Sequence, residues 1–154
     1  PRFDFLYNQT LRFLSYRPRS EKEVIDYLGR KKAGKKTTSE ILAKLNEYKF
    51  IDDLEFAKWF IENRKKGRRV LSLELRQKGI SKEILEKSML HFNIDRKEEN
   101  LIDKLIEKKW RTLKNVPKDK AYERLVGFLV RKGFEYDDVK RKILPLLEKK
   151  SFDD

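Results

Sequence analysis

Cysteine is absent from the 154-residue chain, and histidine occurs once, as His91. The sequence therefore allows no disulfide, no zinc site with thiolate ligands, no cysteine nucleophile and no metal site built from several histidines. No apolar run approaches the roughly 18–20 residues that a membrane-spanning helix needs. The first residues, Pro1 to Asp4, do not resemble the apolar segment of a signal peptide. We therefore expect a soluble, cytoplasmic protein with no membrane partner.

Glycine and proline are also scarce, with six and four residues respectively. Few positions therefore force a helix to end. No segment sustains the alternation of apolar and polar residues that is typical of a half-buried strand. Apolar residues recur instead at helical spacing, as at Leu101, Ile102, Leu105 and Ile106. We therefore expect an all-α protein.

Cap and stop signals predict about nine helices. They are expected over about residues 5–16, 21–31, 39–48, 53–67, 69–77, 82–91, 96–113, 117–133 and 136 onward. Ser20 and Glu23 have the spacing of a capping box, and Thr38 or Ser39, Asp52 or Asp53, Ser81 and Asp95 are expected to cap later helices. Gly79 has the position of a glycine that follows a helix C-terminus. Pro145 predicts an end or a kink in the last helix.

These helices fall into three sets of three. The segment Leu75–Ile80 is similar to the segment 129–134, and in both a glycine is followed by one apolar residue, a polar cap and a helix. The period of about 50 residues lies in the range of helical solenoids. We expect three tandem three-helix repeats, over residues 1–51, 52–93 and 94–154. Because one repeat cannot bury its own apolar face, the repeats should stack into an elongated, curved array, of right or left hand.

Candidate catalytic residues are few. The paired carboxylates Asp52-Asp53 and Asp137-Asp138 lie at expected helix starts, where caps and first-turn acids are favoured. His91 lies near an expected helix C-terminus, where a cation interacts favourably with the helix dipole. No glycine-rich phosphate-binding loop is present. We therefore expect a protein that is not an enzyme and that uses no metal and no cofactor.

Basic residues carry more information than acidic ones. Lysine and arginine number 39 against 26 acidic residues, so the formal charge is +13. The stretch from Arg64 to Lys82 holds eight basic residues and one acid, Glu74, and such an uncompensated cluster predicts contact with a polyanion. The candidate binding residues are Arg64, Lys65, Lys66, Arg68, Arg69, Arg76, Lys78 and Lys82, assisted by Arg30, Lys31, Lys32, Lys35, Lys36, Arg131 and Lys132. Runs such as Lys108-Lys109 are interpreted as solvated faces.

The aromatic residues number 18. Phe56, Trp59 and Phe60 have the spacing of a core-facing helix stripe, and Trp110 continues the stripe of the helix before it. No aromatic series is interleaved with the basic residues, which argues against a platform for stacking nucleic-acid bases. Contact with DNA is therefore expected through phosphates, with weak sequence specificity.

The central motifs resemble those of the RecX family. They are the element Ile51-Asp52-Asp53 with Phe56-Ala57, the basic connection Arg64-Lys65-Lys66-Gly67, and Leu75-Arg76-Gln77-Lys78-Gly79-Ile80-Ser81. Leu11, Leu14, Arg17, Ser20 and Glu23 resemble the family's first unit, and the segment 128–134 resembles its last. The similarity extends over about residues 5–147. One departure is that Gly67 is followed by Arg68-Arg69 where the family often has a proline.

The resemblance implies both a fold and a function. It implies tandem three-helix repeats, in agreement with the period above. It also implies a regulator that binds the RecA–DNA filament in its groove across neighbouring protomers. Such a protein mostly inhibits ATP hydrolysis and strand exchange, and with them recombination and the SOS response. It further implies binding to single- and double-stranded DNA without a cofactor.

Two other interpretations stay open on the residues alone. One is a DNA-binding module with no protein partner, in which a three-helix unit acts as a helix-turn-helix. The other is a helical scaffold for an acidic protein. A base-reading helix needs arginine, asparagine or glutamine at its surface, and the chain has only two glutamines, so we expect little sequence preference. In all cases we expect a monomer.

Overall fold

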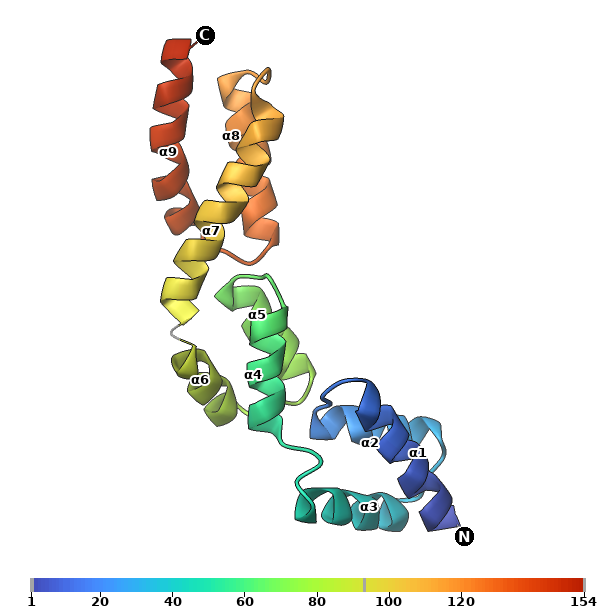
Figure 1. Cartoon of the computed structure of the whole chain (residues 1–154). Coiled ribbons are helices and arrows are strands. Elements are labelled where there is room, and N and C mark those ends of the chain that lie inside the picture. Colours follow the sequence, from blue (N-terminus) through green and yellow to red (C-terminus); the bar gives the residue numbers. More distant parts are fainter. Residues whose placement is uncertain (1, 93, 154) are drawn as a thin grey trace. The chain divides into compact units, whose positions relative to one another are not determined.

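The expected all-α fold is confirmed. A computed structural model describes residues 2–92 and 94–153, and these residues form nine α-helices and one short 3₁₀ helix with no strand (Figure 1). The helices are α1 (Arg2–Tyr16), α2 (Glu21–Arg30), α3 (Lys35–Glu47), α4 (Asp53–Asn63), α5 (Arg68–Gln77), α6 (Lys82–His91), α7 (Ile94–Trp110), η1 (Arg111–Leu113), α8 (Lys118–Arg131) and α9 (Tyr136–Asp153). None of them, within the described ranges, is long and apolar enough to cross a bilayer.

The chain divides into two compact units. The first takes the residues up to Asn63 together with Glu74–His91, and the second takes Arg64–Leu73 together with the residues from Phe92 onward. Helix α5 therefore begins in the second unit and ends in the first. The two halves of the predicted basic strip accordingly belong to different units.

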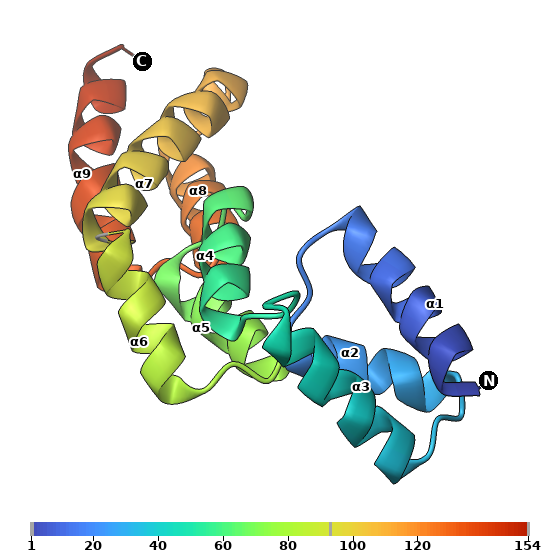
Figure 2. The same cartoon turned by 60° about the horizontal axis from the view of Figure 1, so that its bottom comes forward.

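The first unit has its core between α1, α2 and α3, which contact one another (Figure 2). This core is formed by Leu6, Tyr7, Val24, Leu28, Ile41, Leu45 and Ile51. In the same unit α4 packs against α6. Phe56 of α4 is buried, and its ring lies 5.9 Å from the rings of both Trp59 and Phe60, as the predicted aromatic stripe requires.

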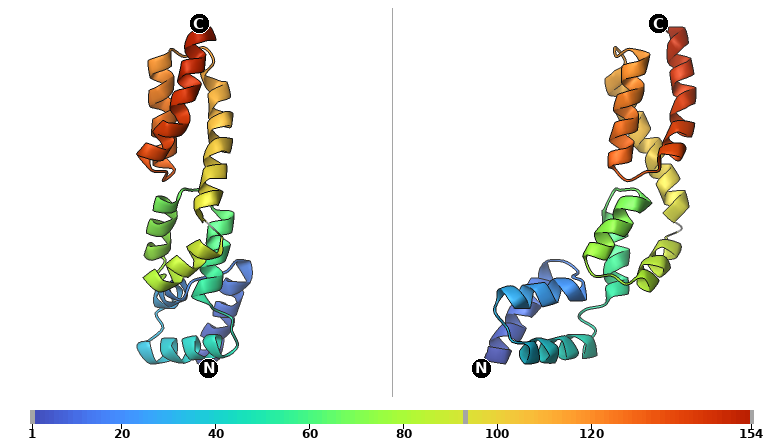
Figure 3. Two further views of the ribbon diagram at one scale, coloured as in Figure 1. Left: turned by 90° about the vertical axis from the view of Figure 1, so that its left-hand side faces the viewer. Right: turned by 180° about the vertical axis from the view of Figure 1, so that it is seen from behind.

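The second unit has its core between α7, α8 and α9, which run side by side in both views of Figure 3. Its buried members are Ile102, Ile106, Leu113, Ala121, Leu125, Leu129, Phe134, Val139, Ile143 and Leu147. Trp110 packs against this core, as its place in the stripe of α7 predicts. The apolar periodicity of α7 and α8 thus identified the buried faces of both helices.

Several helix ends follow the predicted signals. Ser20 and Glu23 form the capping box, with both reciprocal bonds at 3.1 Å. The Asp52 carboxylate accepts from the first-turn N–H groups of Leu54 and Glu55, so it caps α4. The Ser81 hydroxyl caps α6 by accepting from Ile84. Gly79 has φ of +82°, which is the left-handed conformation expected after a helix C-terminus.

Two predicted helix starts are wrong. Helix α3 begins at Lys35 after Gly34, four residues before the predicted start, because the Thr38 N–H bonds to the Gly34 carbonyl and continues the helix instead of breaking it. Helix α7 begins at Ile94, so Asp95 lies inside the helix and not at the position before it, and the side chain of Asp95 lies outside the described part of the structure.

Two predicted helix ends also differ from the structure. Helix α4 ends at Asn63, because Gly67 bonds to the Lys132 carbonyl and not to its own helix. Helix α9 continues through Pro145, so of the predicted end or kink it is the end that is wrong. The buried Ile143 and Leu147 lie on either side of this proline and hold both halves of the helix on the core.

Candidate functional site

The predicted basic residues fall into two groups. Arg64, Lys65, Lys66, Arg68, Arg69, Arg131 and Lys132 belong to the second unit. Arg76, Lys78, Lys82, Arg30, Lys31, Lys32, Lys35 and Lys36 belong to the first. The structure brings the connection between α4 and α5 together with the end of α8, although the two are more than 60 residues apart in the sequence.

Two glycines make this approach possible. The Gly67 N–H donates to the Lys132 carbonyl oxygen at 2.8 Å. A Cβ atom on Gly67 would lie 2.6 Å from the backbone carbonyl carbon and oxygen of Gly133, so only glycine allows the two backbones to come this close. Gly133 itself has φ of +99°, and a Cβ there would meet Val70. The backbone therefore fixes the points from which the flanking basic side chains extend.

Four cations gather at this point, and we call Arg64, Lys66, Lys108 and Lys132 the basic cluster. The pKa of Lys132 is lowered, first by burial and then by the positive charges of Lys66, Lys108 and Arg64. Lys66, Lys108 and Lys132 make no ion pair with a carboxylate anywhere in the described ranges. Repulsion among these three lysines is thus not offset by an ion pair of their own, and an anion would relieve it.

An aromatic ring lies at the edge of the basic cluster. The ammonium groups of Lys109 and Lys132 each lie 5.2 Å from the centre of the Phe128 ring. Such contacts hold an ammonium over a ring face and restrict the directions that it points in. Phe128 therefore orients Lys132 without neutralising its charge.

The arginines that follow Gly67 have contacts within the unit. The Arg69 guanidinium donates to the Val130 carbonyl oxygen at 2.8 Å, near the C-terminal end of α8. The Arg68 N–H donates to a Glu98 carboxylate oxygen at 3.0 Å, so an acid of α7 caps the start of α5. Lys65 is exposed in the connection. Arg69 thus stabilises the arrangement in addition to carrying charge.

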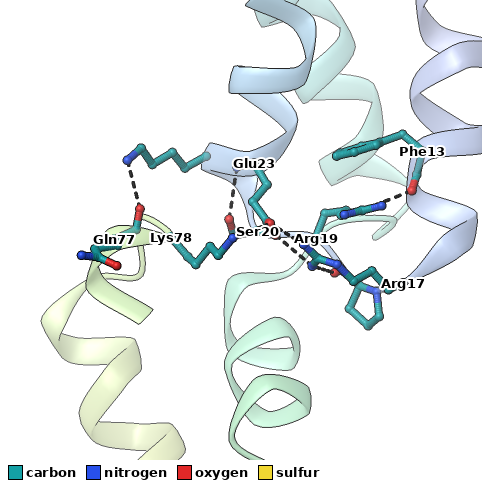
Figure 4. A network of polar contacts seen from close by, with 9 residues as sticks. Phe13, Arg17, Arg19, Ser20, Glu23, Gln77 and Lys78 are labelled. Carbon is teal, nitrogen blue, oxygen red and sulfur yellow. Dashed lines mark hydrogen bonds and ion pairs between the residues drawn. The ribbon is translucent and has the colours of Figure 1, made fainter. Parts of the chain in front are cut away.

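In the first unit, two members of the predicted strip also have structural contacts. The Arg76 guanidinium donates to the Ile80 carbonyl oxygen at 2.8 Å and closes the turn after α5. The Lys78 ammonium lies 3.1 Å from a Glu23 carboxylate oxygen, and Lys22 donates to the Gln77 carbonyl at 3.0 Å (Figure 4). Lys82 is exposed at the start of α6.

Glu23 is the centre of this polar network. Its carboxylate also forms two bonds with the Arg17 guanidinium, at 3.2 and 2.6 Å, on the other side of the capping box (Figure 4). Partial burial alone would raise the pKa of Glu23, but the bonds from Arg17, Ser20 and Lys78 outweigh it and hold the pKa below its ordinary value. This network joins the start of α2 to the turn after α5.

The remaining basic residues surround the turn between α2 and α3. Arg30, Lys31, Lys32, Lys35 and Lys36 are all exposed. Lys32 has φ of +61°, and the Arg2 guanidinium donates to its carbonyl oxygen at 3.2 Å. Lys35 and Lys36 occupy the first turn of α3, where cations oppose the helix dipole and no acid compensates them.

The carboxylate pairs have structural contacts. Asp53 accepts from the Glu21 N–H at 2.9 Å and so caps α2, a helix other than its own. Burial and the neighbouring Asp52 raise its pKa, although the bond from Glu21 lowers it. Asp138 pairs with Arg141 at 2.7 Å. In the part of the chain that the structure describes, no three acidic or histidine side chains are grouped as a metal site would require.

Sequence reasoning missed Lys108 as a member of the basic cluster. It lies near the end of α7 and was interpreted as part of a solvated face. Only the approach of the 64–67 connection to the end of α8 shows which lysines of α7 face other cations. No spacing in a single sequence carries this information.

Models of one protein family match three segments of the chain. They are described as the first, second and third three-helix domains of RecX, and they match residues 7–45, 52–89 and 97–143 respectively. Two solved structures have the same arrangement of helices. A crystal structure of RecX from Lactobacillus salivarius has a TM-score of 0.77 and 28% identity, and the match covers 95% of this chain and 96% of that one. A crystal structure of regulatory protein RecX has a TM-score of 0.75 and 27% identity, and the match covers 92% of this chain and 70% of that one.

Curated relatives carry the same name. The chain is 38% identical over 141 residues to the regulatory protein RecX of Clostridium tetani, covering 89% of this chain and 65% of that protein. For the protein of Geobacillus sp. the identity is 35%, and the match covers 90% of this chain but only 52% of the relative. The regulatory protein RecX of Streptomyces lividans is 30% identical to this chain, and the match covers 93% of this chain and 78% of the relative. The chain thus spans from about half to about four-fifths of these relatives, and it belongs to the RecX family of regulatory proteins.

Proposed function

We propose that this chain regulates a RecA recombinase by binding the RecA–DNA filament in its groove, across neighbouring protomers. Bound there, it lowers ATP hydrolysis and strand exchange, and with them recombination and the SOS response. The observation that carries the proposal is membership of the RecX family over all three of its three-helix domains. Because the chain spans only part of several relatives, the regulatory activity of the whole relatives is carried over to this chain as a proposal.

The basic cluster supports a contact with DNA phosphates within this function. Arg64, Lys66, Lys108 and Lys132 converge from three separate segments, and burial together with the positive charges of the other three lowers the pKa of Lys132. Neutralisation by phosphates releases counterions and makes binding salt-dependent but weakly sequence-specific. We propose that both single- and double-stranded DNA bind here, to a cytoplasmic monomer that needs no cofactor.

The three proposed repeats each supply basic residues, so DNA phosphates would be contacted at several points along the chain. We keep residues 1–51, 52–93 and 94–154 as the proposed repeats, each of which contains one basic connection between two of its helices. The exposed basic residues around the turn between α2 and α3 would add a second phosphate contact, in the first repeat. A groove-binding protein needs such contacts spread along its length, because each exposed ion pair alone is weak.

The deciding experiment is a titration of this chain into RecA during single-strand-dependent ATP hydrolysis. DNA is kept in excess, so that simple sequestration of DNA is excluded. We expect hydrolysis to fall at amounts of this chain well below those of RecA, because one bound molecule affects several protomers. Stimulation of hydrolysis at the same ratios would retain filament recognition but reverse the proposed sign.

A second candidate function is a DNA-binding module without a protein partner. The observation that favours it is the basic cluster, which needs only a phosphate backbone. It predicts tight DNA binding and unchanged hydrolysis by RecA until the DNA itself is saturated. It also predicts that a filament and bare single-stranded DNA compete equally for this chain, whereas a filament regulator prefers the filament.

A further inference from the structure

A cavity of about 300 Å³ lies between α1 and α2 of the first unit. Its lining comprises Gln9, Arg12, Phe13 and Tyr16 of α1, with Tyr27 of α2 and Lys31 just after that helix. The four residues of α1 are spaced at i, i+3, i+4 and i+7, so they share one helix face. This face is aromatic and basic, a combination that the linear sequence hides because its aromatic members come from two helices.

The wall of the cavity is a preformed stack. The Phe13 and Tyr27 rings lie 4.2 Å apart and are nearly parallel, at 14°. The Arg19 guanidinium lies 3.9 Å from the centre of the Phe13 ring. The Arg19 guanidinium and the Tyr27 ring are both too close to the centre of the Phe13 ring to share one of its faces. Phe13 therefore lies between Arg19 and Tyr27 in the stack. Among the described residues no other ring stacks on Tyr27, and the flexible cationic groups of Lys31 and Arg30 lie 5.6 and 6.0 Å from its centre.

Tyr16 stands at the rim of the cavity. Its side chain is 69% exposed, more than any other aromatic side chain in the described residues. Among the described residues, no ring stacks on Tyr16, and it is not a member of the core of the first unit. An exposed aromatic beside a stacked pair offers a second flat surface at low entropic cost of ordering, because tyrosine has only two side-chain torsions.

The polar groups of the cavity suit an anion joined to a flat polar ring. Arg12 and Lys31 are exposed cations that make no ion pair within the described residues, and no acid lines the cavity. The Oε1 atom of Gln9 is buried and, in the described part of the chain, is the one such side-chain atom without a hydrogen-bond partner. Leaving an acceptor unsatisfied costs free energy, which a ligand N–H group would recover once the Gln9 amide turns toward the cavity.

We propose that this cavity binds an unstacked base of single-stranded DNA. The base stacks on Tyr27 and against Tyr16, Gln9 accepts from one of its N–H groups, and Arg12 and Lys31 contact the flanking phosphates. Duplex DNA does not fit this site, because its bases already stack on one another. The inference deepens the DNA contact of the proposed function and rests on it, but it adds a dependence on the base that phosphate binding alone does not have.

The test compares two single-stranded oligonucleotides of equal length, one of deoxythymidines and one abasic, bound to the full chain at fixed salt. We expect the abasic strand to bind more weakly to the wild-type protein. We expect Tyr16→Ala and Tyr27→Leu each to weaken thymidine-strand binding about tenfold and to leave abasic binding unchanged. Tyr16→Phe should retain binding, because the ring is kept.

The matched control is Tyr48→Ala, an exposed tyrosine of the same unit that lies outside the cavity. It should change neither affinity. Tyr16 is exposed enough for its replacement to leave the fold intact, which circular dichroism checks. A second pair, Arg12→Gln and Lys31→Gln, should weaken the binding of both strands and lower the salt slope by about 0.7 each.

Each other outcome overturns the inference. Equal binding of the two strands by the wild-type protein leaves the phosphate contact standing and removes the base site. Equal losses for both strands in Tyr16→Ala assign that residue to the general fold. Competition by free thymidine monophosphate at the concentrations at which the strand binds would identify a nucleotide site instead. If neither strand binds, the proposed DNA contact fails together with the inference.

Discussion

The Gly67 N–H donates to the carbonyl oxygen of Lys132 at 2.8 Å, and this bond sets the geometry of the basic cluster. The bond joins the connection after α4 to the turn after α8, so it holds the backbone of Lys66 close to that of Lys132. A main-chain contact of this kind loses little entropy when a ligand binds, because the backbone is already fixed.

Gly67→Ala should destabilise the second unit by about 1–3 kcal/mol, because the new Cβ would lie 2.6 Å from backbone atoms of Gly133 that cannot rotate away. The measurement is urea unfolding followed by the fluorescence of Trp110, in a Trp59→Phe background. The same variant should weaken DNA binding, since the basic cluster loses its support.

The matched control is Gly29→Ala. Gly29 lies inside α2, and a Cβ there would meet nothing within 4 Å. This variant should stabilise the first unit by about 0.4–1 kcal/mol, because alanine restricts the unfolded chain and favours the helix. Equal effects of the two substitutions would contradict the close approach at Gly67.

The double variant Lys66→Gln/Lys132→Gln should lower the salt dependence of single-stranded DNA binding. Each phosphate contact contributes a slope of about 0.7, so the loss of two should reduce the slope of log K against log salt by about 1.4. Lys118→Gln/Lys120→Gln makes the same change of charge in the first turn of α8, at the other end of the helix. If the two double variants lose equal slope, the basic cluster has no special role.

DNA affinity should fall as the pH rises toward the ordinary lysine pKa of about 10.4, because a lysine whose pKa is lowered loses its proton below that value. Burial and three neighbouring cations lower the pKa of Lys132 in the free protein, and a bound phosphate would raise it. At a pH above the lowered pKa, DNA binding therefore requires Lys132 to take up a proton. Lys132→Arg should flatten this dependence, because a guanidinium stays charged. Lys118→Arg serves as the control and should titrate like the wild type.

The fold was largely predictable because its signals are local. Ser20 with Glu23, Asp52, Ser81 and Gly79 each act within one turn of a helix, and all four behave as their spacing predicts. The errors occur where tertiary contacts compete with a local preference. Helix α4 ends early because Gly67 finds a partner 65 residues away, and α9 continues because the core holds Leu147.

The candidate site was predictable only in part. The composition of the stretch from Arg64 to Lys82 identified a basic strip, but not that its two ends belong to different units. Lys78 looks like a binding residue in the sequence, and the structure gives it an ion pair with Glu23. The stacked pair Phe13–Tyr27 was missed because stacking between two helices leaves no periodic trace in either.

Glu23→Gln should destabilise the first unit by about 1–2 kcal/mol at neutral pH, since two charged hydrogen-bond donors lose their carboxylate partner. Because the pKa of Glu23 is lowered in the folded state, its contribution is fully present above the unfolded value of about 4.3. The contribution is lost as the pH falls through the folded value. The stability difference between variant and wild type should therefore close in acid, as urea unfolding of Trp59 in a Trp110→Phe background can measure. Glu86→Gln, an exposed residue of α6, should show no such difference at either pH.

Pro145→Ala should stabilise the second unit by about 1–3 kcal/mol. Pro145 has no N–H to donate to the Arg141 carbonyl, and its ring crowds that carbonyl inside a helix that nevertheless continues to Asp153. Alanine restores the bond without moving Ile143 or Leu147, which are buried on either side. Pro117→Ala is the control, because a residue that only precedes α8 needs no helical N–H, and the change should stay within about 0.5 kcal/mol. Destabilisation by Pro145→Ala, read from Trp110, would mean that the core is fitted to a bend that the proline imposes and that alanine removes.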